Sequence, residues 1–197
     1  MLPQSSFRRE ALRSGAKYGA IAGLIATWSI STAIAASELE LGLPIGTFYA
    51  VMGMSLGAGG FGPAAYVGFG LHLLTGTLLG AVIGFAMSRF AIMKFLNPYR
   101  AVAAGIGAGV AVWLVLFLPV TELLVQPSMA RISHLLAQSM PLQSAALGNA
   151  DQFVWGIALS AIVFHLVWGA IFGYMTSAFL RIKAFRAAHP GEGGMMH

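Results

Sequence analysis

The sequence predicts an all-α integral membrane protein: a four-helix bundle built from two parallel repeats of two spans each. Its 197 residues are 58% hydrophobic and only 9% charged, a balance that a water-soluble domain of this length cannot hide in its core. Four apolar stretches are long enough to cross about 30 Å of hydrocarbon, which takes roughly 20 helical residues. One motif also recurs in register: His72-Leu-Leu-Thr-Gly76-Thr-Leu-Leu-Gly80 and, 93 residues later, His165-Leu-Val-Trp-Gly169-Ala-Ile-Phe-Gly173.

The predicted spans cover about residues 17–37, 63–88, 101–125 and 152–180. Cationic residues gather before the first span, between the second and third, and after the fourth: Arg8, Arg9, Arg13 and Lys17; Arg89, Lys94 and Arg100; Arg181, Lys183 and Arg186. By the positive-inside rule both termini and the central loop are predicted to be cytoplasmic, in the inner (plasma) membrane of a prokaryotic cell. The same topology accounts for the net charge of +5, so no nucleic-acid partner is expected.

The domain organisation follows the duplication. We expect a cytoplasmic N-terminal segment at 1–14, a first membrane repeat at 15–90, a cytoplasmic loop at 91–99, a second repeat at 100–180 and a mobile cytoplasmic tail at 181–197. Each repeat also carries an external segment too short to span, at about 44–56 and 128–140, which is interfacial or re-entrant. Pro119 is predicted to kink the third span.

Four polar residues in or beside the spans form the candidate site. Both histidines, His72 and His165, lie in the outer half of the bilayer, each roughly 25 Å above the nearest cytoplasmic arginine at a rise of about 1.5 Å per residue. Glu38 and Glu122 end the first and third spans at matching positions. Helical side chains tilt toward the helix N-terminus, so the histidines lean outward and the glutamates inward, and the four groups can converge.

Three interpretations of this convergence stay open. The imidazoles can simply fix helix rotation while the glycines allow close packing. Two imidazoles and two carboxylates can instead hold a zinc, iron or copper ion, with His72, His165, Glu38 and Glu122 as ligands. Alternatively, His72 and His165 can ligate a haem between the second and fourth spans. Because the chain has no cysteine, thiolate metal sites and disulfides are excluded.

The glycine-rich first and third spans, with His72-x-x-x-Gly76 and His165-x-x-x-Gly169 in the second and fourth, resemble small duplicated prokaryotic membrane proteins of the YagU-like type. The resemblance covers the two repeats and implies no reaction. Since no catalytic motif is present, the leading hypothesis is a non-catalytic accessory subunit or homo-oligomer that packs through glycine-rich faces. The alternatives are a metal- or haem-binding protein and a small proton-linked or solute transporter.

Overall fold

The computed structural model describes residues 4–91, 96–128, 134 and 150–189. Within these ranges the chain is helical, with turns between the helices and no strand. The elements are α1 (Gln4–Glu40), α2 (Thr47–Ser55), α3 (Phe61–Ala91), α4 (Pro98–Val112), the π-helix η2 (Trp113–Phe117), α5 (Leu118–Val120), the π-helix η3 (Thr121–Val125) and α8 (Ala150–Ala188). The predicted second external segment, 128–140, falls almost entirely outside the described residues.

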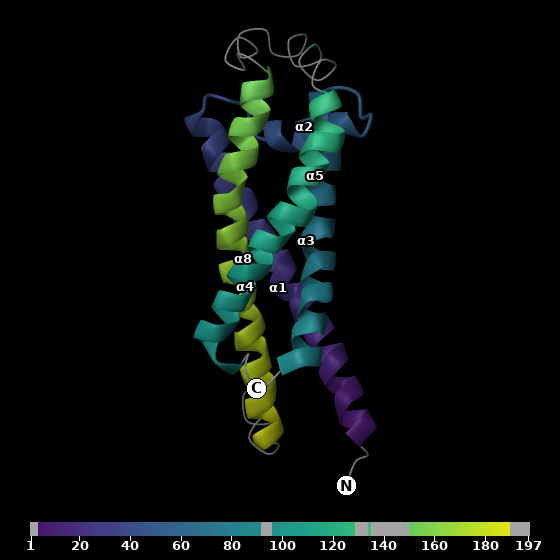
Figure 1. Cartoon of the computed structure of the whole chain (residues 1–197), viewed down its shortest axis with the longest axis vertical. Coiled ribbons are helices and arrows are strands. Elements are labelled where there is room, and N and C mark those ends of the chain that lie inside the picture. The colour runs from purple at the N-terminus through teal and green to yellow at the C-terminus, as the bar shows by residue number, and fades with distance from the viewer. Residues whose placement is uncertain (1–3, 92–95, 129–133, 135–149, 190–197) are drawn as a thin grey trace, which may run out of the picture.

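Four helices are long and apolar enough to cross a membrane, over Leu12–Glu40, Phe61–Arg89, Pro98–Ser128 and Ala158–Ala187. The all-helical class and the four long apolar helices are therefore confirmed. The first described turn of α1 and the last turn of α8 lie at the same end of the molecule (Figure 1). We call this the terminal end and the opposite end, which α2 crosses, the α2 end. The fourth helix runs eight residues past its predicted limit at Leu180, because no proline or glycine interrupts the chain before Pro190.

Helices α1 and α3 form a hairpin in which the two backbones are in direct contact. A Cβ atom on Gly23 would fall on the carbonyl oxygen of Gly76, and one on Gly80 would fall on the carbonyl oxygen of Gly19. The same close approach joins Gly15 to Gly84. Glycine at these positions allows the axes of α1 and α3 to approach closely, as small residues do at helix interfaces in membranes.

The second hairpin, α4 with α8, is closed by glycines in the same way. A Cβ on Gly105 would fall on the carbonyl oxygen of Gly169, and one on Gly109 would fall on that of His165. The duplicated sequence aligns Gly19 with Gly105 and Gly80 with Gly173. Gly19 meets the carbonyl oxygen of Gly80, whereas Gly105 meets that of Gly169, one turn before Gly173. The two hairpins therefore use the same kind of contact in registers that differ by one helical turn.

The third long helix contains a π turn on each side of Pro119. Proline has no N–H, so the carbonyl one turn earlier cannot receive its usual hydrogen bond. The backbone N–H of Leu118 donates to the carbonyl of Trp113, five residues back, and that of Gln126 donates to Thr121. Such wider turns occur where a helix is interrupted, often beside functional sites. The predicted distortion at Pro119 thus takes the form of two π turns.

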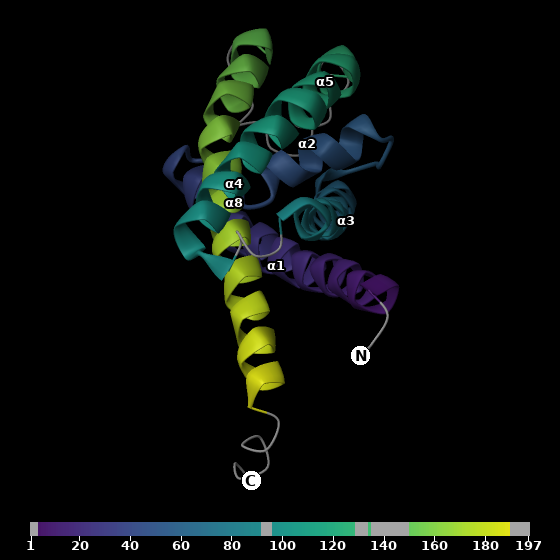
Figure 2. The same ribbon diagram turned by 60° about the horizontal axis from the view of Figure 1, so that its bottom comes forward.

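The hairpins join through α1, which packs against both α3 and α8. The indole N–H of Trp168 on α8 donates to the hydroxyl of Thr27 on α1 at 2.9 Å. Among the described residues α3 makes no comparable contact with α4 or α8, so the helices follow the order α3, α1, α8, α4. In both ribbon views α4 begins beside α8 and the chain then leans away through α5 (Figure 2). At the α2 end, α2 packs on α3 and also contacts η3.

Candidate functional site

Glu38 holds α2 in place. Its side chain is fully buried, and its carboxylate accepts hydrogen bonds from the backbone N–H groups of Gly46, at 2.6 Å, and Phe48, at 2.8 Å. These amides lie at the N-terminus of α2, where N–H groups have no partner within the helix and where the helix dipole favours a negative charge. Both carboxylate oxygens of Glu38 are therefore used to anchor α2.

The short helix α2 lies directly on α3 and brings a tyrosine to His72. A Cβ on Gly53 would fall on the carbonyl oxygen of Ala64, and one on Gly68 would fall on that of Tyr49, so neither position admits a side chain. This close packing places the Tyr49 ring 5.4 Å from the His72 ring, centroid to centroid, at an angle of 46°. The predicted first external segment is thus a helix that contributes directly to the surroundings of His72.

Each of these two rings carries a polar atom that is buried without a hydrogen-bond partner: the hydroxyl of Tyr49 and Nε2 of His72. Ser31 lies beside the Tyr49 hydroxyl, and its own hydroxyl donates to the carbonyl of Thr27 at 2.9 Å. Leaving such a group unpaired costs about 1–3 kcal/mol. In native proteins an unpaired buried polar group usually marks a bound water, an ion or a functional site.

His165 approaches the same region from α8. Its Nδ1 lies 2.8 Å from the carbonyl oxygen of Ala161; because a carbonyl only accepts, Nδ1 carries the hydrogen, and Nε2 of the neutral ring keeps a lone pair. The Phe117 ring, from η2, packs edge-on against the imidazole at a centroid separation of 5.1 Å. An electrostatic interaction reaches from His165 on α8 to His72 on α3.

The two glutamates do not behave as a pair. Glu38 is buried and bound to backbone amides, whereas Glu122 is exposed on η3. Among the described residues no group of three or more histidine, aspartate or glutamate side chains is placed to hold a metal ion. The four-ligand set predicted from the sequence is thus unsupported, and the two histidines remain as its candidate members.

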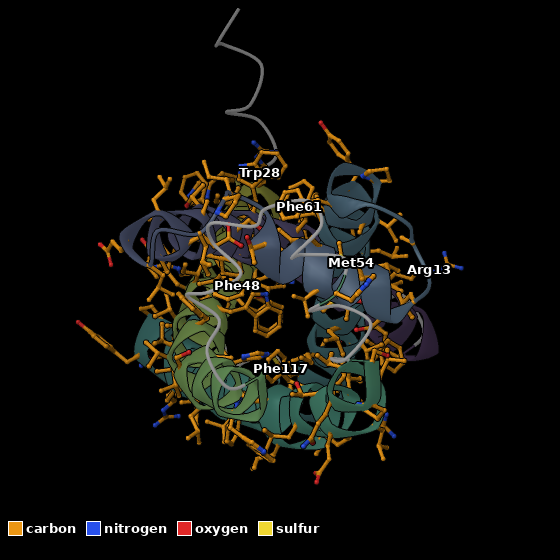
Figure 3. All side chains as sticks on the ribbon, turned by 90° about the horizontal axis from the view of Figure 1, so that it is seen from above. Arg13, Trp28, Phe48, Met54, Phe61 and Phe117 are labelled. Carbon is orange, nitrogen blue, oxygen red and sulfur yellow. The ribbon has the colours of Figure 1, made fainter. Side chains whose placement is uncertain are left out.

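Tyr49 is the site residue that sequence reasoning missed. The only available signal was its position in a segment too short to span the membrane, flanked by glycines at 46 and 53. Nothing local indicated that α2 would fold inward against α3. In the view from above, Phe48 of the same helix and Phe117 of η2 lie toward the middle of the ring of helices, whereas Trp28 and Arg13 lie at its rim (Figure 3).

Directly beyond His165, toward the terminal end, lies an apolar core. Trp168 and Phe172, one and two turns beyond His165 on α8, stack with their ring planes 2° apart. They form a core with Ala22, Ala26 and Ile30 of α1, and Ile83 and Met87 of α3 pack against it. The polar region around the histidines is therefore bounded on this side by a filled core.

Fold and site together define the class: over the residues that the structure describes, a helical chain with four long apolar helices and, near the α2 end, a tyrosine in contact with a buried histidine. Comparison of the chain with protein-family models, with curated proteins and with solved structures gave no match.

Proposed function

We propose that this chain is a multi-pass protein of a prokaryotic inner membrane that binds a small polar ligand between its two hairpins, at His72 and His165. The observation that carries the proposal is that two rings in contact each bury a polar atom without a partner, Nε2 of His72 and the hydroxyl of Tyr49. If the imidazoles served only to fix helix rotation, each would be expected to bond to a neighbouring group, as His165 does with Ala161. A ligand that bonds to both atoms offsets the cost of burying them.

In the same proposal the lipid bilayer is the surrounding solvent and both ends of the chain are cytoplasmic. The four apolar helices and the common position of the first and last described turns support this topology. The basic residues on the connecting segments set its direction.

The transport hypothesis has less support from this arrangement. A route for protons or solute requires polar groups or water along the whole depth of the bundle. The stacked rings of Trp168 and Phe172 fill the interior directly beyond His165. A packed core directly beyond His165 suits binding better than conduction in this conformation.

The accessory-subunit or homo-oligomer hypothesis was based on glycine-rich faces available to partners. The glycines of α1, α3, α4 and α8 that form these faces are occupied by one another inside the chain. The apolar residues that remain exposed, such as Val82 and Val115, can be covered by lipid as well as by a partner. This hypothesis therefore stays a prediction without a specific surface to carry it.

Native mass spectrometry of the mildly extracted, tag-free protein tests the ligand proposal. We expect a stoichiometric bound species on the wild type that is absent from His72→Ala and from His165→Ala. His189→Ala is the matched control, because His189 is an exposed histidine at the terminal end, and it should retain the species. Circular dichroism checks that all variants keep their helix content. A wild type without a bound species, or equal occupancy in every variant, would refute the proposal.

A further inference from the structure

We infer that α2 is a lid over His72, which lifts from α3 about glycine hinges at its two ends and opens the site toward the α2 end. This inference rests on the proposed function, since it names how the same site is reached. The site needs such a device, because the Tyr49 hydroxyl and Nε2 of His72 are buried. A ligand reaches these two atoms only when the segment that covers them moves.

Both connections of α2 are built around glycines in a conformation that other residues rarely adopt. Within the described part of the chain four residues have a positive φ, and all four flank α2: Gly42, Gly46, Gly57 and Gly60. A Cβ on Gly42 or Gly57 would have nothing within 4 Å, so close packing does not require glycine at these two positions. Glycine changes φ and ψ at small steric cost, and a few such residues at the ends of an element absorb the rotation of a hinge.

The position of α2 makes it the cover of the site. In the view from above, α2 lies across the ring of helices (Figure 3). The Tyr49 ring of α2 contacts two rings of α3, those of Phe69 and His72, at centroid distances of 5.3 and 5.4 Å. Lifting α2 therefore removes Tyr49 from His72 and uncovers both polar atoms. The opposite direction, toward the terminal end, is filled by the stacked rings of Trp168 and Phe172.

The contact between α2 and α3 is close but buries few large side chains. A Cβ on Gly53 would fall on the backbone of α3. Half of the buried apolar cluster between the two helices is alanine: Ala50, Val51, Met54 and Ala64. Hydrophobic free energy is proportional to the apolar area buried, and alanine buries little. Opening also allows the Tyr49 hydroxyl and Nε2 of His72 to bond to water, which offsets part of the cost of separating the helices.

Glu38 is the latch of the lid. Its carboxylate, at the end of α1, accepts hydrogen bonds from the backbone N–H groups of Gly46 and Phe48 at 2.6 and 2.8 Å. These bonds tie the N-terminus of α2 to α1, whereas α2 otherwise packs on α3 and contacts η3. Weakening the latch should raise the population of the open form and leave the glycine contacts between α1 and α3 in place, because these contacts lie further along both helices.

Acetylation of Tyr49 by N-acetylimidazole measures opening, because the reagent transfers its acetyl group to a tyrosine oxygen that it can reach. Peptide mass spectrometry of the full-length protein in detergent gives the rate at Tyr49 relative to Tyr99, which is 84% exposed on the first turn of α4. We expect Glu38→Gln to raise this ratio about tenfold, because hydrogen bonds to a charged acceptor hold the lid closed. Glu40→Gln, at an exposed position, is the control and should not raise it.

A disulfide between α2 and α3 tests the lid directly. A Cβ on Gly46 would lie 3.3 Å from the Cβ of Ala65, close to the roughly 3.5–4.5 Å that separates these atoms in a disulfide, and the chain has no cysteine of its own. In the double variant Gly46→Cys, Ala65→Cys, we expect oxidation to lower acetylation of Tyr49 at least about tenfold and reduction to restore it, because only a local opening admits the reagent. The reduced protein is the matched control, since it carries the same strain at position 46, where φ is 92°.

Equal acetylation of Tyr49 in the oxidised and reduced protein would overturn the lid. If the cross-link does not form, Glu38→Gln decides alone, and an unchanged ratio there would also overturn it. An equal rise at Tyr18, which stacks on Phe179 inside the bundle, would have the same meaning, because the whole protein would then be opening.

The outcomes also separate the lid from the proposed function. If the lid opens and closes as expected but native mass spectrometry finds no bound species, the ligand site is refuted and the lid stands. If a species is bound at His72 and acetylation of Tyr49 ignores the cross-link, the ligand site stands and the lid is refuted.

Discussion

Replacing Gly80 by alanine should separate the helices of the first hairpin. A Cβ at position 80 would fall on the carbonyl oxygen of Gly19 and lie 2.8 Å from the Cα atom of Gly23, about 0.6 Å short of ordinary contact at 3.4 Å. Both neighbours are backbone atoms, so no side chain can turn aside to make room. The axes of α1 and α3 must move apart by a comparable distance, and a radial gap of about 0.5–1 Å already forfeits a quarter to a half of the dispersion energy of each contact.

We therefore expect Gly80→Ala to destabilise the protein by about 1–3 kcal/mol, the usual cost of overpacking. Gly70→Ala is the matched control on the same helix, because nothing lies within 4 Å of a Cβ at that position. There alanine only removes the conformational freedom of glycine, which stabilises a helix by about 0.5–1 kcal/mol. The two substitutions are chemically identical, yet they should change stability in opposite directions.

Thermal unfolding in one detergent, followed by tryptophan fluorescence, measures the difference. For a chain of this size about 1 kcal/mol corresponds to roughly 2–4 °C in the midpoint, so Gly80→Ala should unfold several degrees below the wild type and Gly70→Ala slightly above it. Equal shifts of the same sign would refute the reasoning, because the change would then reflect helix propensity and not the contact between α1 and α3.

Three further predictions concern other contacts. Glu38→Gln should weaken the anchor of α2 by about 1.5–3 kcal/mol, because a hydrogen bond to a charged acceptor is lost. Hydrogen exchange at the α2 amides should therefore accelerate. Glu40→Gln, at an exposed position, is the control and should leave this exchange unchanged. Trp168→Phe removes the bond to Thr27 and should cost about 0.5–1.5 kcal/mol in thermal unfolding, whereas the same change at the exposed Trp28 should cost less. Pro119→Ala restores a backbone N–H and should replace the π turns by α-helix, which moves Phe117 relative to His165; an unchanged imidazole resonance of His165 in NMR would contradict this.

Part of the candidate site was predictable because one motif marked it. An imidazole inside an apolar span is costly, so finding His72 and His165 at matching positions indicated a shared site; the two interact electrostatically in the fold, and the shared site itself stays a prediction. The glutamates were harder to assign, because the sequence places Glu38 and Glu122 alike at the ends of their spans. Only Glu38 is followed by a short described helix whose free N–H groups it binds, and this contact decides that one carboxylate is buried and anchored while the other is exposed.

The sequence by itself determined the class of fold. Four segments are long and apolar, glycines recur at helical spacing, and no alternating pattern is present. These features predict helices that cross a membrane, because each such helix satisfies its own backbone hydrogen bonds. Tertiary packing alone decided what surrounds the histidines: the close approach of α2 to α3 that brings Tyr49 to His72, and the π turn that carries Phe117 onto His165. The physical reason is that hydropathy and periodicity record only which residues prefer an apolar environment. The partner of a buried polar atom depends on contacts between segments far apart in the chain, and no local pattern encodes these.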